Sequence, residues 1–283
     1  MKVAFQGERG AYSEEAVRAC FGEIAEPVPC RENTDVGAAV EAGEVACGVL
    51  PIENSLAGSV APTYDVLASE ALEVVGEIVL PIHHCLLGVP GASLSGVRRV
   101  LSHPVALAQC RAFLAANPTV RAVPYYDTAG AARAIAEAGD PADAAIASRV
   151  AGDAYALDVL ARDLEDRPDN QTRFFVLLRR GATPPPLPPG GSPRTALLLD
   201  AADAPGSLVR LLLPFAERGI NLSKLESRPG AQPWSYRFFI ELDAPADAPA
   251  VVEALAAAAP HASQVHVLGT FRRWLAGSPS VPG

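Results

Sequence analysis

The sequence lacks any long apolar run, although 49% of its 283 residues are hydrophobic. A helix that crosses a membrane needs about 18 or more consecutive apolar residues, and no run here reaches that length. The opening MKVAFQGERG also lacks the apolar stretch and the small-residue cleavage site of a secretory leader. We therefore expect a soluble, cytoplasmic protein with no membrane contact.

Positive charge is also scarce and scattered. The chain has 23 Lys and Arg against 32 Asp and Glu, a formal net charge of -9, and no basic block. A nucleic acid needs a positively charged surface to neutralise its phosphates, so nucleic acid is an unfavourable partner. The remaining composition, with 19% charged residues, is that of a globular protein whose partner is a small molecule.

Metal-binding patterns are missing as well. No two of the five cysteines form a C-x-x-C pair, so we expect neither disulfides nor metal-bound thiolates. His83 and His84 are adjacent, and on a strand they would point to opposite faces, which disfavours a shared metal. The sequence thus predicts no metal, with structural or merely polar roles for both histidines.

A proline-rich segment divides the chain. Residues 181–193, GATPPPLPPGGSP, cannot form a helix or a sheet ladder and are predicted to be a linker. In residues 1–180, short β-rich runs alternate with helical patterns, which favours an α/β domain with largely parallel sheets. Residues 194–275 follow the order βαββαβ, a ferredoxin-like module. The tail, 276–283, is predicted to be disordered.

Two polar clusters follow predicted strands in the first third of the chain. In FQGERGAYSEEA, Gly7 and Gly10 precede a helix whose N–H groups could bind an anion, although an ordinary strand-to-helix turn explains them equally well. In PIENSLAGSV, the residues Glu53, Asn54 and Ser55 lie at the carboxyl end of a strand, where open sheets bind ligands. A turn in which Asn and Ser bond their own backbone is the alternative.

Two further clusters come later. In SHPVALAQC, Ser102 is expected to cap a helix with Pro104 in its first turn, and Gln109 would lie near the same face two turns on. In NQTRFF, Thr172 and Arg173 precede an apolar strand. A threonine there is normally a β-former and an arginine is normally solvated. The position directly before the linker nevertheless predicts a strand that returns to the sheet and closes a cleft.

Together and in this order, the four clusters resemble the signature motifs of the prephenate dehydratase family. The stretch DAPGSLVRLLLPFAERGINLSKLESRP is similar to the ACT regulatory domain attached to it. The resemblance covers nearly the whole chain. It implies a two-lobed catalytic domain of periplasmic-binding-protein type, with the substrate between the lobes, and a chain that crosses between them near EIVLPIHHCLLG and TRFFVLL. The implied reaction converts prephenate to phenylpyruvate with loss of CO₂ and the ring hydroxyl, on the way to phenylalanine.

The resemblance also implies roles for single residues. Thr172 would assist departure of the hydroxyl, as a hydrogen-bond donor more than a full general acid, because a threonine hydroxyl is a weak acid. Asn54, Ser102 and Gln109 would orient the reacting groups, and Arg173 would bind a carboxylate. The other cleft residues would be Glu53, Ser55, Gly10 and Phe174. Because the substrate gains aromaticity on fragmenting, positioning and proton delivery suffice and no cofactor is expected.

The ACT-like module is expected to bind phenylalanine as an effector. Its site would comprise Gly206, Ser207, Leu208, Val209, Asn221, Leu222, Glu226, Ser227, Arg228 and Pro229. Ser207 departs from the alanine common in the family, which puts the effector affinity in question. A capped amphipathic helix would explain GSLVRLLL equally well without the ESRP stretch. Modules of this kind rarely act alone, so a homodimer or homotetramer is expected.

Three alternatives stay open at this stage. The same scaffold could act on arogenate, which carries an amino group in place of the side-chain keto oxygen. A two-lobed domain with an amino-acid-binding module could instead be a non-enzymatic sensor. A related decarboxylase that keeps the hydroxyl is the third. The joint presence of Thr172, Ser102 and Gln109 favours catalysis over sensing, and the Thr-Arg-Phe stretch disfavours the decarboxylase.

Overall fold

The structure is a computed structural model that describes residues 1–201, 204–230 and 235–276. The predicted tail therefore lies outside the described residues from residue 277 onward. Within the described part, no helix has both the length and the apolar character needed to cross a membrane.

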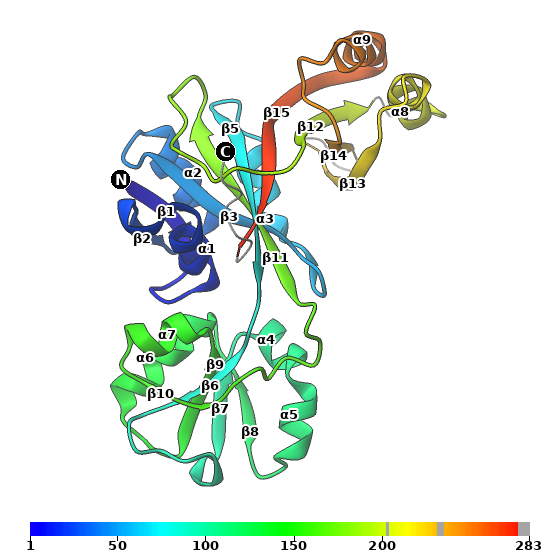
Figure 1. The fold of residues 1–283 in the computed structure, drawn as a ribbon. Helices are drawn as coiled ribbons and strands as arrows, with labels where there is room; N and C mark the ends of the chain where they lie inside the picture. Colours follow the sequence, from blue (N-terminus) through cyan, green and yellow to red (C-terminus); the bar gives the residue numbers. More distant parts are fainter. Residues whose placement is uncertain (202–203, 231–234, 277–283) are drawn as a thin grey trace.

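The first lobe is one layer of sheet with helices on it (Figure 1). Its elements are β1 (Lys2–Gln6), α1 (Tyr12–Phe21), a 3₁₀ turn (Gly22–Ile24), β2 (Glu26–Cys30), α2 (Asn33–Glu41), β3 (Cys47–Asn54), β4 (Gly58–Ser59), α3 (Ala61–Leu67), β5 (Leu72–Pro81) and β11 (Gln171–Arg179). The strand order is β5-β11-β3-β1-β2, with β4 paired to β3. Strand β11 is antiparallel to both neighbours, whereas β1 is parallel to β2 and β3.

The second lobe interrupts the first between β5 and β11. Its elements are β6 (Cys85–Gly88), a 3₁₀ turn (Leu94–Gly96), β7 (Arg99–Ser102), α4 (Pro104–Gln109), α5 (Arg111–Ala116), β8 (Arg121–Pro124), α6 (Thr128–Ala138), β9 (Asp143–Ala147), α7 (Arg149–Ala154) and β10 (Asp158–Ala161). The order is β10-β6-β9-β7-β8, with β6 antiparallel to β9 and β10. The predicted α/β class is confirmed, but the sheets are mixed because the strands next to the crossovers run against their neighbours.

Two crossovers join the lobes, one at residues 82–84 and one at residues 162–170, as predicted from the chain order (Figure 1). The two-lobed architecture of periplasmic-binding-protein type is therefore confirmed. Because β5 and β11 are paired along their length, both connections leave the first lobe side by side. A cleft between the lobes is thus bordered by the ends of these two strands.

The C-terminal module has the predicted ferredoxin-like order. It comprises β12 (Pro193–Ala201), α8 (Ser207–Glu217), β13 (Leu222–Pro229), β14 (Tyr236–Leu242), α9 (Pro249–Ala258), a 3₁₀ turn (Ala259–His261) and β15 (Ala262–Leu275), with sheet order β13-β14-β12-β15. Alternate side chains of β12 serve two cores: Leu197 and Leu199 pack with the helices, and Ala196 and Leu198 pack on the first lobe.

Strand β15 extends beyond its own module. Its last residues pair in parallel with β5, with Arg273 opposite Glu77 and Leu275 opposite Val79, so the two sheets form one continuous sheet (Figure 1). The linker also lies against the protein, since Leu187 packs on the core of the first lobe. The C-terminal module is therefore fixed directly to the strand that leads into the cleft.

Candidate active site

A cavity of about 400 Å³ lies between the two lobes. The first lobe supplies residues from α1, β3, β4 and β11, and the second supplies residues from α4 and the start of α6. Four of the predicted site residues line this cavity: Asn54, Gln109, Thr172 and Phe174. A larger cavity of about 620 Å³ lies at the linker and the C-terminal module, but it contains none of these groups.

Asn54 is held in one orientation by the backbone. Its Oδ1 accepts hydrogen bonds from the N–H groups of Leu56 at 3.0 Å and Ala57 at 2.9 Å. The Nδ2 group must therefore face the other way, where it donates to Thr172 Oγ1 at 2.9 Å. Since the Thr172 oxygen already accepts a hydrogen bond, its own hydrogen is available for a group in the cavity.

Gln109 closes a ring of amides with Asn54 and Asn170. Its Nε2 donates to Asn54 Oδ1 at 3.2 Å, and its Oε1 accepts from Asn170 Nδ2 at 3.1 Å. Asn170 Oδ1 in turn accepts from Asn54 Nδ2 at 2.9 Å. Asn54 ends β3 and Asn170 directly precedes β11, so Gln109 of the second lobe is bonded to one residue of the first lobe and to one of the second crossover.

His84 and Tyr12 extend this network. His84 Nε2 lies 2.9 Å from Gln109 Oε1, and Nδ1 lies 2.7 Å from the Tyr12 hydroxyl. Burial lowers the pKa of His84 and raises the pKa of Tyr12 well above its ordinary value, so both are neutral near pH 7. Both residues line the cavity, although neither was among the predicted site residues. The signal that could have found His84 is its place on the predicted crossover between lobes.

Comparisons with known proteins agree over nearly the whole chain. A sequence model of prephenate dehydratase matches residues 3–182, and a model of the ACT domain matches residues 195–260. This chain belongs to the prephenate dehydratase family.

Relatives in the family include arogenate dehydratase/prephenate dehydratase 2 of Arabidopsis thaliana, which is 40% identical over 96% of this chain and 72% of its own length. A bifunctional chorismate mutase/prephenate dehydratase of Neisseria gonorrhoeae is 37% identical over 96% of this chain and 74% of its own. The crystal structure of a prephenate dehydratase from Arthrobacter aurescens in complex with L-Phe is 34% identical, with a TM-score of 0.88 over 96% of this chain and 90% of that one.

Ser102 does not line the cavity of this family member. It is the last residue of β7, is fully buried, and donates its hydroxyl to the carbonyl of Ile146 at 2.5 Å. The cap of α4 is His103, whose Nδ1 accepts from the N–H of Val105 at 3.3 Å. The expectation that Ser102 caps this helix is therefore wrong, because Ser102 ends the strand and the capping position falls one residue later, at His103.

Gly10 and Ser55 also have structural partners. The Gly10 N–H donates to the carboxylate of Glu14 at 2.7 Å, and the Gly10 carbonyl accepts from Ser148 Oγ at 2.7 Å. The Gly10 N–H is therefore not available to an anion, since the carboxylate of Glu14 already accepts from it. Ser55 Oγ donates to the carbonyl of Asp169 at 3.2 Å, which ties the end of β3 to the second crossover.

Arg173 is the main correction to the predicted site. Because side chains alternate along a strand, Thr172 and Phe174 face the cavity and Arg173 faces the opposite side of β11. Its guanidinium bonds Glu77 and lies 2.6 Å from Glu241 Oε1 of the ACT domain. Burial alone would lower the pKa of Arg173, but these carboxylates outweigh burial and raise it. Arg173 thus belongs to the contact between domains, not to the cavity.

Glu53 shares this contact. It accepts from Arg173 Nη1 at 2.8 Å and pairs with Lys224 Nζ of the ACT domain at 2.8 Å. Burial would raise the pKa of Glu53, but the hydrogen bonds and charges of Lys224 and Arg173 outweigh burial and lower it. The expectation of a cleft residue is corrected, since this carboxylate points away from the cavity.

One chain does not bring the predicted effector residues together. Gly206, Ser207, Leu208 and Val209 lie at the start of α8, whereas Asn221 and Leu222 follow its end. An 11-residue helix spans about 16 Å, which separates the two groups. The other predicted residues are Glu226, Ser227, Arg228 and Pro229 on β13. Glu226 faces the first lobe, where it bonds Ser59 and lies 3.1 Å from the Tyr64 hydroxyl.

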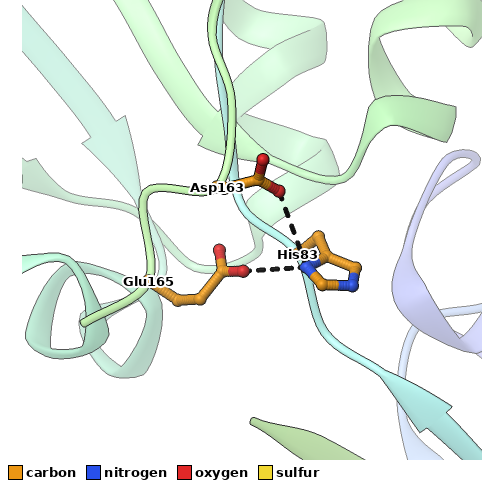
Figure 2. Close-up of side chains that lie close together, drawn as sticks. All are labelled: His83, Asp163 and Glu165. Carbon is orange, nitrogen blue, oxygen red and sulfur yellow. Dashed lines mark hydrogen bonds and ion pairs between the residues drawn. The ribbon is translucent and has the colours of Figure 1, made fainter. Parts of the chain in front are cut away.

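Within the described residues, one group has side chains close enough to surround a metal: His83, Asp163 and Glu165 (Figure 2). His83 Nδ1 lies 2.8 Å from Glu165 and 3.7 Å from Asp163. The other Glu165 oxygen accepts from the N–H of His84 at 2.8 Å. The group joins the two crossovers, and these contacts account for it as a hydrogen-bonded bridge between them.

Proposed function

We propose that this chain catalyses the decarboxylative dehydration of prephenate to phenylpyruvate, a step toward phenylalanine. The observation that carries the proposal is the position of Thr172. Its side chain lines the interlobe cavity, and its hydroxyl oxygen accepts a hydrogen bond from Asn54 Nδ2. The arrangement leaves the hydrogen of this hydroxyl available for donation to a ligand. This is the chemistry that departure of a ring hydroxyl requires.

The proposed step balances without a cofactor. The bond between the ring and the departing carboxylate breaks, CO₂ leaves, and its bonding electrons enter the ring. The bond between the ring and its hydroxyl breaks at the far end of the ring, assisted by a hydrogen bond from the Thr172 O–H, and the leaving hydroxyl takes one proton from solvent and departs as water. Aromatisation drives the step, so the protein supplies orientation and a hydrogen bond where negative charge develops.

Substrate carboxylates need partners other than Arg173. Helix α1 begins at the cavity, where Ala11, Tyr12 and Ser13 line the wall, and no side chain caps its first N–H groups. We propose that these N–H groups, at the positive end of the helix dipole, take one carboxylate. This assignment requires no buried cation in the cavity, and leaves Arg173 in the domain contact.

Phenylalanine is the proposed effector of the ACT domain. Because α8 keeps the two predicted segments about 16 Å apart in one chain, a site made from both would need a second copy. The proposal therefore includes a homodimer or homotetramer whose ACT domains meet at the effector site. The cytoplasmic location expected from the composition stays a prediction.

The decisive measurement is phenylpyruvate formation from prephenate by the purified chain, compared with Thr172→Val and with added phenylalanine. We expect the wild-type protein to form phenylpyruvate at a rate that phenylalanine changes. In Thr172→Val this rate should fall by about 10²- to 10⁴-fold, the range for positioned proton donors. Thr172→Ser, which keeps a hydroxyl, is the matched control and should retain more activity.

Arogenate run in parallel separates the two substrates, since faster turnover of arogenate would reassign the substrate and keep the site. Folded wild-type protein that binds prephenate without product would instead indicate a sensor. A product that has lost CO₂ but kept the hydroxyl would indicate a decarboxylase.

A further inference from the structure

His84 lies at the end of a chain of hydrogen bonds whose direction is set by the backbone. The N–H groups of Leu56 and Ala57 require Asn54 Oδ1 to be an acceptor. A third donor to that oxygen is Gln109 Nε2, at 3.2 Å. The Gln109 amide can therefore point in only one of its two orientations, with Nε2 toward Asn54 and Oε1 toward the second crossover.

This orientation fixes the proton on His84. Gln109 Oε1 is an acceptor and lies 2.9 Å from His84 Nε2, so Nε2 must carry the hydrogen. In a neutral ring Nδ1 is then an acceptor, and the Tyr12 hydroxyl stands 2.7 Å from it. The Tyr12 hydroxyl also lies 2.9 Å from the carbonyl oxygen of His83, so its single hydrogen can serve either that oxygen or Nδ1. The contact with Gln109 is satisfied by the Nε2–H tautomer. The opposite tautomer would place a lone pair against the Gln109 oxygen.

The surroundings hold the ring in this place. His84 is 2% exposed, its backbone N–H donates to Glu165, and the Tyr12 ring meets it edge-on with centroids 5.6 Å apart. Six titratable groups surround the ring of His84. They are Tyr12, Glu15, His83, Cys85, Cys110 and Glu165. Nothing in this arrangement requires the ring to touch a ligand, although it forms part of the cavity wall.

We propose that His84 is a positioning residue for the dehydratase reaction: its Nε2–H holds the Gln109 amide, and through Asn54 the direction of the Thr172 hydroxyl. Without that donor, Gln109 keeps Asn170 as a partner but loses the contact that stops its amide from rotating into the cavity. Asn54 Oδ1 would then lose one of its three donors, which weakens the hold on the amide whose Nδ2 donates to Thr172 Oγ1. This inference rests on the proposed function for its effect on turnover, but its account of the tautomer does not.

Two nearly isosteric variants test the proposal. In His84→Gln the side-chain NH₂ reaches the place of Nε2 and can still donate to Gln109. In His84→Asn the shorter amide reaches only the place of Nδ1. Misplacement of a catalytic group by a remote change can cost about 100-fold, so we expect His84→Asn to lower kcat by about 100-fold with little change in KM. His84→Gln should keep kcat within about tenfold of wild type, because the donor is restored.

Nitrogen NMR of the wild-type protein labelled at histidine gives a readout independent of activity. The expected result is a neutral His84 ring protonated at Nε2 at pH 7. Protonation at Nδ1, or equal loss of kcat in the Gln and Asn variants with unchanged thermal unfolding, would overturn the proposal. So would an Asn variant as active as wild type. Absence of turnover in wild-type protein with the Nε2–H tautomer present would instead count against the proposed function alone.

Discussion

Asn54 sets the direction of the hydrogen bonds in the cleft. Its carbonyl is committed to two backbone N–H groups and its amide to Thr172, so a side chain with one acceptor end and one donor end is required. A buried donor or acceptor left unsatisfied costs about 1–3 kcal/mol, which disfavours every other orientation of the ring of amides. The chemistry of Thr172 thus depends on the identity of its neighbour.

Asn54→Asp tests this dependence with a nearly isosteric change. The new carboxylate can still accept from Leu56 and Ala57, but it accepts where Nδ2 donated, so the Thr172 hydroxyl turns toward it and away from the cavity. We expect kcat to fall by about 10²-fold or more, as for loss of the hydroxyl itself, with modest change in thermal unfolding. Steady-state kinetics beside a melting curve measure both, and a fully active variant would contradict the assigned direction.

At the scale of elements, the two lobes meet where the loop before α1 reaches the start of α7. Gly10 has φ +86° and its backbone packs on Ala151, while Ser148 caps α7 and also donates to the Gly10 carbonyl. A Cβ on Gly10 would lie 2.5 Å from Ala151 Cα. The glycine is therefore required by backbone conformation and by close approach, and not by a ligand.

Gly10→Ala should destabilise the protein more than Gly91→Ala does. Gly91 has φ +83° but nothing within 4 Å of an added Cβ, so its variant measures the backbone strain alone, about 1–2 kcal/mol. Gly10→Ala adds overpacking between lobes, about 1–3 kcal/mol more. Urea unfolding of both variants gives the difference, and equal losses would show that the lobes do not pack as described.

At the scale of the whole molecule, buried charges join the ACT domain to the strands of the cleft. Arg173 of β11 lies among Glu77, Glu53 and Glu241, and its side chain is 16% exposed. Residue 173 follows Thr172 directly, so the strand that presents the hydroxyl on one face carries the domain contact on the other. A shift of the ACT sheet would thus act on β11 itself.

Arg173→Met should therefore reduce stability and not substrate affinity. Removing one partner of a buried ion pair costs about 3–5 kcal/mol, and the low end is expected because Arg273 still pairs Glu77 and Arg194 lies 3.6 Å from Glu241. Arg167→Met, at an exposed pair, is the control and should change little. A stable Arg173 variant with a raised KM for prephenate would restore the predicted carboxylate role.

Tyr64→Phe tests the coupling between the domains. The Tyr64 hydroxyl bonds Glu226 of β13 beside Ser59, which lines the cavity, but Tyr64 itself does not. If phenylalanine acts through β13, the variant should keep its basal kcat and lose part of the phenylalanine effect, since coupling energies are about 1–3 kcal/mol. Rates with and without phenylalanine give the answer, and an unchanged effect would place the coupling elsewhere.

Local patterns in the sequence predicted the order of the elements, the linker, the βαββαβ module and four side chains of the cavity wall: Asn54, Gln109, Thr172 and Phe174. These depend on periodicity, turn residues and motif order, which act over a few residues. Tertiary structure decided the rest: it placed the ACT domain against the face of β11 that carries Arg173, joined β15 to β5, and buried Ser102 against the carbonyl of Ile146. His84 and Tyr12 entered the network because packing brings distant segments together, and that packing has no signature in either segment alone.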